Sequence, residues 1–180
     1  MTTSAEAREQ FHALLNAWNA RDLDRFCAQL TPDIQWHDLG MPHPPAIGRD
    51  AVRSFSASIL RAFPDFTYEL RGSLCVAEDG LSCVGPFRLR ARFTGYFDPP
   101  GFAPTGRQAD IDGLDYLQFR DGLVSRIETR FDPLDLAQQL FGLEVRAPAG
   151  SWRERLSVRV QRAHAWWLRR AGAVARSAGA

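Results

Sequence analysis

Acidic side chains inside stretches that otherwise have the pattern of buried strands are the residues of this sequence best suited to chemistry. The first is Asp115, which a period of two places on one face with Ile111, Gly113, Leu117 and Phe119. Desolvation by apolar neighbours raises the pKa of a carboxyl toward the range in which it exchanges protons near neutral pH. We therefore predict that Asp115 is a buried carboxyl with an acid/base role.

A second acidic group closes the following strand. The same period of two would put Glu128, Arg130 and Asp132 on one face. Two interpretations are open: a catalytic and substrate-binding row in which the Arg fixes an acid, or an ordinary salt-bridged strand face in water. Asp132 also precedes Pro133, the preferred first residue of a helix. It is therefore both a candidate acid/base and a candidate N-cap.

Histidines offer a third candidate group. His37 lies at the end of a short strand and could assist proton transfer, although a half-exposed strand histidine explains it equally well. His43 lies among prolines and is predicted to belong to a loop. The four histidines show neither H-x-H nor H-E-x-x-H spacing, so the sequence predicts no metal site.

These residues need elements that position them, and helical spacing of apolar residues predicts three helices in the first third of the chain. The first covers about residues 5–20, the second runs from an N-cap at Asp22 to Leu30, and the third ends before Pro64. Residues 31–33, Thr-Pro-Asp, are expected to break the chain before a short strand over 34–39.

After the third helix the period changes from helical to strand-like. Residues 66–74, 81–94, 108–120 and 123–131 alternate as strands, and Asp121-Gly122 is typical of a hairpin turn. Helices followed by a run of strands predict an α+β fold, with a curved antiparallel sheet wrapped around the N-terminal helices.

Charge divides the chain into two parts. Residues 1–150 carry 15 Arg against 20 acidic residues, whereas residues 151–180 carry 7 Arg against Glu154 alone. Apolar residues of this C-terminal part recur at spacings of three and four, which predicts a basic amphipathic helix. We expect a domain over residues 1–146 and a helical tail over 147–180. The tail either packs on the domain or on a second subunit, or it docks an acidic partner or an anionic membrane surface.

Composition narrows the class of protein. The chain has 180 residues, of which 45% are hydrophobic and 24% charged, as in soluble globular proteins. The absence of lysine excludes Schiff-base and P-loop chemistry. An acidic domain without a zinc finger does not favour nucleic-acid binding. Three cysteines without a C-x-x-C pair, and no apolar N-terminal run, predict a cytoplasmic protein.

The order of these segments resembles the SnoaL-like polyketide cyclases of the nuclear-transport-factor-2-like superfamily. The resemblance covers about residues 5–143, and the stretches that carry it are AWNARDLDRF, IQWHD, AIGRDAVRSF, AFPDFTYEL, TGYF with APTGR, GLDYLQFRDGLVSRIETRFD and DLAQQLFGL. It implies a cone-shaped domain with a pocket between the concave sheet and the helices, and often a homodimer.

The resemblance also implies roles for individual residues. The acid/base aspartate beside the closing helix of these cyclases corresponds to Asp132. The end of the first strand commonly borders the pocket, so Trp36 and Asp38, together with Trp18 of the first helix, are expected to contact the substrate. Where the family commonly has T-H-T-G, this chain has Arg92-Phe93-Thr94-Gly95. Phe93 therefore replaces a hydrogen-bond donor, and the candidates to substitute for it are Arg92, Tyr96 and Tyr116.

Three hypotheses follow. The first is a cofactor-independent acid/base enzyme that acts on a hydrophobic, carbonyl-rich small molecule, as a polyketide cyclase does in an intramolecular aldol closure. The second is an epoxide hydrolase or epoxide-opening cyclase on the same scaffold. The third is a non-catalytic domain that binds a ligand or partner, because a fold alone does not fix a function.

Overall fold

The computed structural model describes residues 3–40, 45–142 and 147–177, with side chains up to Trp167. The chain forms two compact units, residues 1–143 and 144–180. The boundary that the sequence suggests at residues 146 and 147 stays a prediction.

Three helices open the first unit. Helix α1 (Ser4–Asn19) begins with a capping box between Thr3 and Glu6, and α2 (Leu23–Ala28) begins at the predicted N-cap, Asp22. Helix α3 (Arg49–Ala62) ends before Pro64, as the restriction that a proline places on its neighbour requires. The three predicted helices are confirmed, but the second ends at Ala28 rather than at Leu30, which begins strand β1 (Leu30–Asp38).

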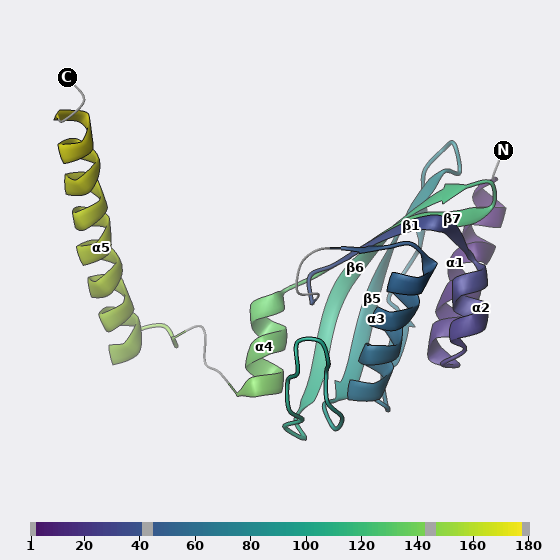
Figure 1. The fold of residues 1–180 in the computed structure, drawn as a ribbon, viewed down its shortest axis with the longest axis horizontal. Coiled ribbons are helices and arrows are strands. Elements are labelled where there is room, and N and C mark those ends of the chain that lie inside the picture. The colour runs from purple at the N-terminus through teal and green to yellow at the C-terminus, as the bar shows by residue number, and fades with distance from the viewer. Residues whose placement is uncertain (1–2, 41–44, 143–146, 178–180) are drawn as a thin grey trace. The chain divides into compact units, whose positions relative to one another are not determined.

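Within the described residues, seven strands form one curved sheet in the order β2-β1-β7-β6-β5-β3, with β4 beside β5. Their bounds are β1 Leu30–Asp38, β2 Ala46–Ile47, β3 Thr67–Leu70, β4 Cys75–Val76, β5 Ser82–Arg92, β6 Gln108–Arg120 and β7 Leu123–Phe131. All pairs are antiparallel except β1 with β7, which is parallel. Figure 1 shows the helices lying along the curved sheet, which confirms the α+β class.

The expected chain break at residues 31–33 is wrong, since β1 runs through it. The register of β1 against β7 shifts between Leu30 and Gln35, and β2 pairs with β1 only from Gln35 onward. Pro32 therefore lies where the ladder is irregular, a position that tolerates a missing backbone N–H.

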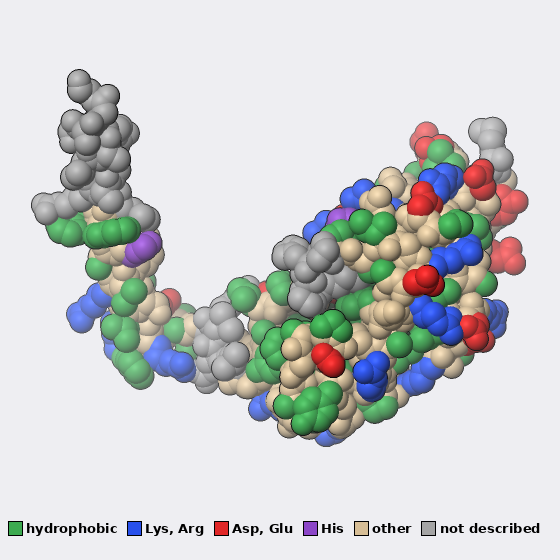
Figure 2. Space-filling view, viewed as in Figure 1, with side chains coloured by type: hydrophobic (Ala, Val, Ile, Leu, Met, Phe, Trp, Pro, Cys, Tyr) green, Lys and Arg blue, Asp and Glu red, His purple; other side chains and the backbone are tan. Residues whose placement is uncertain are grey.

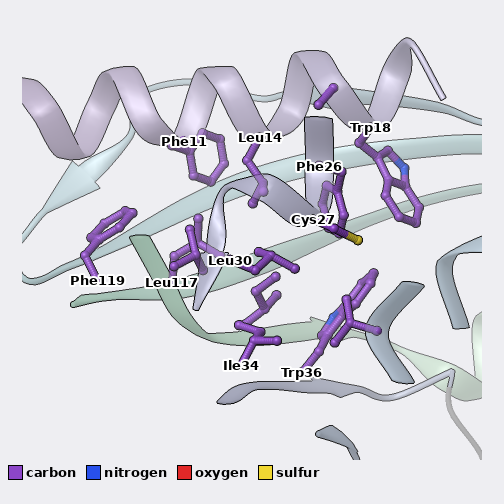
Figure 3. Packing of buried hydrophobic residues seen from close by; sticks show 14 of the residues in the cluster. Phe11, Leu14, Trp18, Phe26, Cys27, Leu30, Ile34, Trp36, Leu117 and Phe119 are labelled. Carbon is purple, nitrogen blue, oxygen red and sulfur yellow. The ribbon is translucent and has the colours of Figure 1, made fainter. Parts of the chain in front are cut away.

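Aromatic packing joins the helices to the sheet. Trp18 of α1 lies with its ring 5.7 Å from that of Trp36 on β1 and 5.3 Å from that of Phe26 on α2 (Figure 3). Gly85 of β5 allows α1 to approach, because a Cβ there would lie 2.5 Å from the ring of Phe11. This packing holds α1 at the inner face of the sheet.

Two further helices follow the sheet. Helix α4 (Pro133–Phe141) contacts β6 and ends at Gly142, whose φ of 69° suits glycine. Helix α5 (Trp152–Ser177) belongs to the second unit. Within the described residues, no helix is both long and apolar enough to cross a membrane.

Candidate active site

A cavity of about 300 Å³ lies within the first unit, walled by the inner face of the sheet and by α1, α3 and α4. Its walls are overwhelmingly apolar and aromatic. Phe93, directly after β5, stacks on Phe63 with 5.2 Å between ring centroids, and the ring of Phe141 on α4 makes a T-shaped contact with that of Phe93. Such walls suit a ring-containing, largely hydrocarbon ligand.

Three polar side chains interrupt this apolar surface in a row across neighbouring strands. Thr129 of β7 is the register partner of Asp38 on β1 and of Asp115 on β6. All three line the cavity, and among its described lining residues Asp38 and Asp115 are the ones that can carry a charge. The Cα atoms of the two aspartates are two interstrand spacings apart, about 10 Å.

Hydrogen bonds fix the Asp115 end of this row. The hydroxyl of Tyr68, from β3, donates to Oδ2 of Asp115. Oδ1 of Asp115 is buried and has no hydrogen-bond partner among the described residues. The indole Nε1–H of Trp36 donates to Oγ1 of Thr129 at 3.0 Å, so the single hydroxyl hydrogen of Thr129 must point elsewhere.

The cavity raises the pKa of both carboxyls. Burial raises the pKa of Asp115 to about 6, although polar contacts with Tyr68 and Thr129 partly offset the effect of burial. Burial raises the pKa of Asp38 to about 7; the backbone N–H of Gly40 opposes this rise and the negative charge of Asp115 adds to it. The two groups therefore titrate next to one another near neutral pH.

The predicted Glu128–Arg130–Asp132 row does not face the cavity. The register between β6 and β7 shifts by one residue where Gln118 pairs with Arg126 and Phe119 with Val124. This bulge turns Ile127 and Thr129 inward, so Glu128 and Arg130 point to the outer face. There Arg130 and Arg126 form ion pairs with Glu128 and hold the pKa of its carboxyl below its ordinary value. The alternative of a salt-bridged outer face is the one observed.

Asp132 caps α4. Its Oδ1 accepts hydrogen bonds from the backbone N–H groups of Leu134 at 2.9 Å and Asp135 at 3.2 Å, and Pro133 occupies the first turn. The residue is exposed, whereas Pro133 and Leu136 line the cavity. This geometry supports the capping interpretation.

Replacing Asp132 with alanine is expected to lower the free energy of unfolding by about 1 kcal/mol, because two N–H groups of α4 lose their acceptor. Denaturant unfolding would measure this loss, and Asp132→Ser, which keeps a capping oxygen, should largely restore it. If Asp132→Ala left stability unchanged, the capping role would be wrong.

The other candidates divide between the cavity and the outer surface. Trp18, Trp36 and Phe93 line the cavity, and their contact with a substrate stays a prediction. His37 alternates with Trp36 and Asp38 and is the register partner of Glu128, so it lies on the outer face. His43 lies outside the described residues.

Neither tyrosine predicted to replace the family's histidine reaches the cavity. Tyr96 is 62% exposed. The hydroxyl of Tyr116 accepts a hydrogen bond from Gln118 on the outer face at 2.8 Å. The hydroxyl that does reach the cavity belongs to Tyr68.

Sequence reasoning missed Tyr68 and Thr129. The alternation of Phe66, Tyr68 and Leu70 in the predicted strand 66–74 could have placed Tyr68 on an inner face, since a period of two was already evident there. Thr129 carried no usable signal, because a period of two counted from Val124 places it on the wrong face. Among the described residues, no group of three or more His, Cys, Asp or Glu side chains could hold a metal ion.

Stability should fall as the pH rises through about 6 to 7. A carboxyl whose pKa is higher in the folded than in the unfolded state binds its proton more tightly in the folded state. Its contribution to the free energy of unfolding is therefore complete near pH 4 and is lost as the pH rises through the folded-state pKa. Thermal unfolding from pH 5 to pH 8 should show this loss, and Asp115→Asn should reduce it. Asp112→Asn, an exposed acid on β6, is the matched control. An equal pH dependence in all three proteins would contradict the burial of the charge.

Comparisons with known proteins agree with this architecture. A family model described as "SnoaL-like domain" matches residues 11–127. The structure of AclR from Streptomyces galilaeus, assigned as a hydroxylase, is similar with a TM-score of 0.67 and 23% identity, over 90% of this chain and 97% of that one. A protein of Jannaschia sp. CCS1, assigned as a SnoaL-like polyketide cyclase, is similar with a TM-score of 0.65 and 20% identity, over 76% of this chain and 92% of that one.

A third similar structure is that of an enzyme described with a different reaction. SalBIII, described as an epoxide hydrolase/cyclase-like enzyme of pyran ring formation in the polyether salinomycin, gives a TM-score of 0.63 and 18% identity, over 75% of this chain and 97% of that one. At these identities the likeness shows the fold alone. No curated protein sequence matches the chain.

Proposed function

This chain belongs to the SnoaL-like family, and from that premise we propose that it is an acid/base enzyme that closes a ring in a hydrophobic, carbonyl-rich small molecule, in the manner of a polyketide cyclase. The observation that carries the proposal is the pair of cavity carboxyls, Asp38 and Asp115, whose pKa values are raised to about 7 and about 6. At a pH between these values, Asp115 is ionised while Asp38 keeps its proton.

That protonation state supplies both halves of an aldol closure. The carboxylate of Asp115 takes a proton from a carbon that lies between two carbonyl groups. The resulting enolate carbon then bonds to the carbon of a further carbonyl group in the same molecule. The oxygen of that carbonyl receives the proton of Asp38 and becomes a hydroxyl. Raised pKa values favour both transfers, since each group then exchanges protons close to the working pH.

After the ring has closed, Asp115 is protonated and Asp38 is ionised. One proton must therefore pass from Asp115 back to Asp38 before the next turnover. Thr129 lies between the two carboxyls in the register of the sheet. Its oxygen already accepts the N–H of Trp36, which directs its own hydrogen away from that ring. In this proposal the hydroxyl of Thr129 orients Asp115 and assists the return of the proton.

A second candidate function is the opening of an epoxide. The same carboxyl pair favours it, because a protonated acid can donate to the epoxide oxygen while a carboxylate takes the proton of an attacking hydroxyl or water. In this candidate function the two carboxyl groups are those of Asp38 and Asp115 rather than those of Glu128 and Asp132.

Two apolar probes distinguish the functions. With 2-tetralone in D₂O, the ring-closing enzyme should accelerate exchange of the hydrogens beside the carbonyl, measured by proton NMR. With styrene oxide in ¹⁸O-water, an epoxide-opening enzyme should release a diol that carries the label. If neither probe reacts faster than in buffer, while both bind in the cavity, the non-catalytic ligand-binding hypothesis takes the place of both enzymes. The homodimer and the cytoplasmic location stay predictions.

A further inference from the structure

Helix α5 presents an apolar stripe that the cavity chemistry does not use. Successive residues of an α-helix are about 100° apart around its axis. A sector of about 80° therefore contains four large apolar residues, Trp152, Leu156, Val160 and Trp167. All four are exposed, Trp152 to 66% and Val160 to 61%. Figure 2 shows such apolar side chains next to basic ones along the described part of the helix.

Arginines border this stripe on both sides. By the same geometry, Arg153 and Arg159 lie about 60° from the middle of the stripe, one on each side. Residues 151–180 contain seven Arg against Glu154 alone. Two arginines therefore border the stripe, Arg155 and Arg162 lie farther round at about 100° and 120° from its middle, and Val158 lies on about the opposite side.

This arrangement suits the surface of a lipid bilayer better than a dry protein interface. Packing the stripe against a protein would also desolvate Arg159, which is costly unless an acidic partner lies opposite. Lipid phosphates pair with guanidinium groups, and tryptophan favours the level of the headgroups. Over its described residues the helix is not apolar enough to cross a bilayer, and it has the composition of a helix that lies in the plane of the membrane surface.

We propose that α5 binds the surface of anionic membranes, with Trp152, Leu156, Val160 and Trp167 inserted at the headgroup level and the arginines paired with lipid phosphates. This proposal is independent of the chemistry in the cavity. It predicts attraction that depends on negative lipid charge and weakens as salt screens that charge.

Vesicle co-sedimentation of the full chain tests it. The chain should sediment with phosphatidylcholine vesicles that contain about one third phosphatidylglycerol and much less with phosphatidylcholine alone, because each arginine near an anionic surface adds to binding. Val160→Ser should lower the partition coefficient between the anionic vesicles and water about tenfold, since it removes one inserted apolar side chain. Val158→Ser, which makes the same change on the other side at a residue 42% exposed, should bind like the unaltered chain.

Charge reversal gives a second matched pair. Arg159→Glu should weaken binding by about tenfold or more, whereas Arg71→Glu, an exposed position in the first unit, changes the net charge equally and should have little effect. Equal binding to neutral and anionic vesicles, or equal losses from the two valine variants, would overturn the proposal. So would a dimer in sedimentation velocity without lipid that Val160→Ser, but not Val158→Ser, converts to a monomer, because a second copy would then cover the stripe.

Discussion

Replacing Asp115 with asparagine is expected to lower the rate of hydrogen exchange in 2-tetralone by about 100- to 10,000-fold, the usual contribution of a positioned general base. Asparagine keeps the size of the side chain and can still accept the hydrogen bond from Tyr68, but it cannot take a proton. Binding of the probe should change little, since the apolar walls of the cavity are unaltered. Proton NMR of the exchange and a binding titration measure the two quantities.

The same substitution should stabilise the protein above pH 7. Burial of the ionised carboxyl of Asp115 costs more free energy than its polar contacts return, and a neutral amide avoids this cost. Lost exchange activity combined with a higher melting temperature at pH 8 cannot arise from a misfolded variant. Asp112→Asn should change neither quantity. If Asp115→Asn kept its activity, Asp115 would not be the base.

The sequence predicts the fold well because local signals and the overall fold agree. The N-cap at Asp22, the end of α3 before Pro64 and the turn at Asp121-Gly122 each depend on one or two residues with strong backbone preferences. The break expected at Pro32 fails because tertiary pairing overrides the local preference: β1 continues as a strand with an irregular register.

The site is harder to predict because it depends on which alternate residues of each strand face the cavity. Asp115 lies where a period of two places it, since β6 is regular from Gln108 to Gln118. One extra residue in β7 reverses the facing of everything after it, so Glu128 and Arg130 point outward and Thr129 inward. The partnership of Asp38 with Asp115 depends on the parallel pairing of β1 and β7, segments about 90 residues apart along the chain, for which no local pattern exists.

Replacing Asp38 with asparagine is expected to change the shape of the pH–rate profile as well as its height. In the unaltered enzyme the rate should rise as Asp115 ionises, with a pKa of about 6, and fall as Asp38 loses its proton, with a pKa of about 7. Without Asp38 the falling limb should disappear, because asparagine has no proton to lose in this range. The plateau should be about 100-fold lower, since the substrate oxygen then receives no proton from an acid.

The double variant decides whether the two carboxyls act as one unit. If Asp38 donates only while Asp115 accepts, Asp38→Asn combined with Asp115→Asn should be no slower than Asp115→Asn alone, because groups that act together are not additive. Asp33→Asn, an exposed acid of β1 paired with Arg120, is the matched control for Asp38 and should keep both limbs. A falling limb that persists in Asp38→Asn would transfer the acid role to another group of the cavity. Tyr68 would not account for that limb, because burial and the charge of Asp115 raise the pKa of its hydroxyl well above the ordinary value.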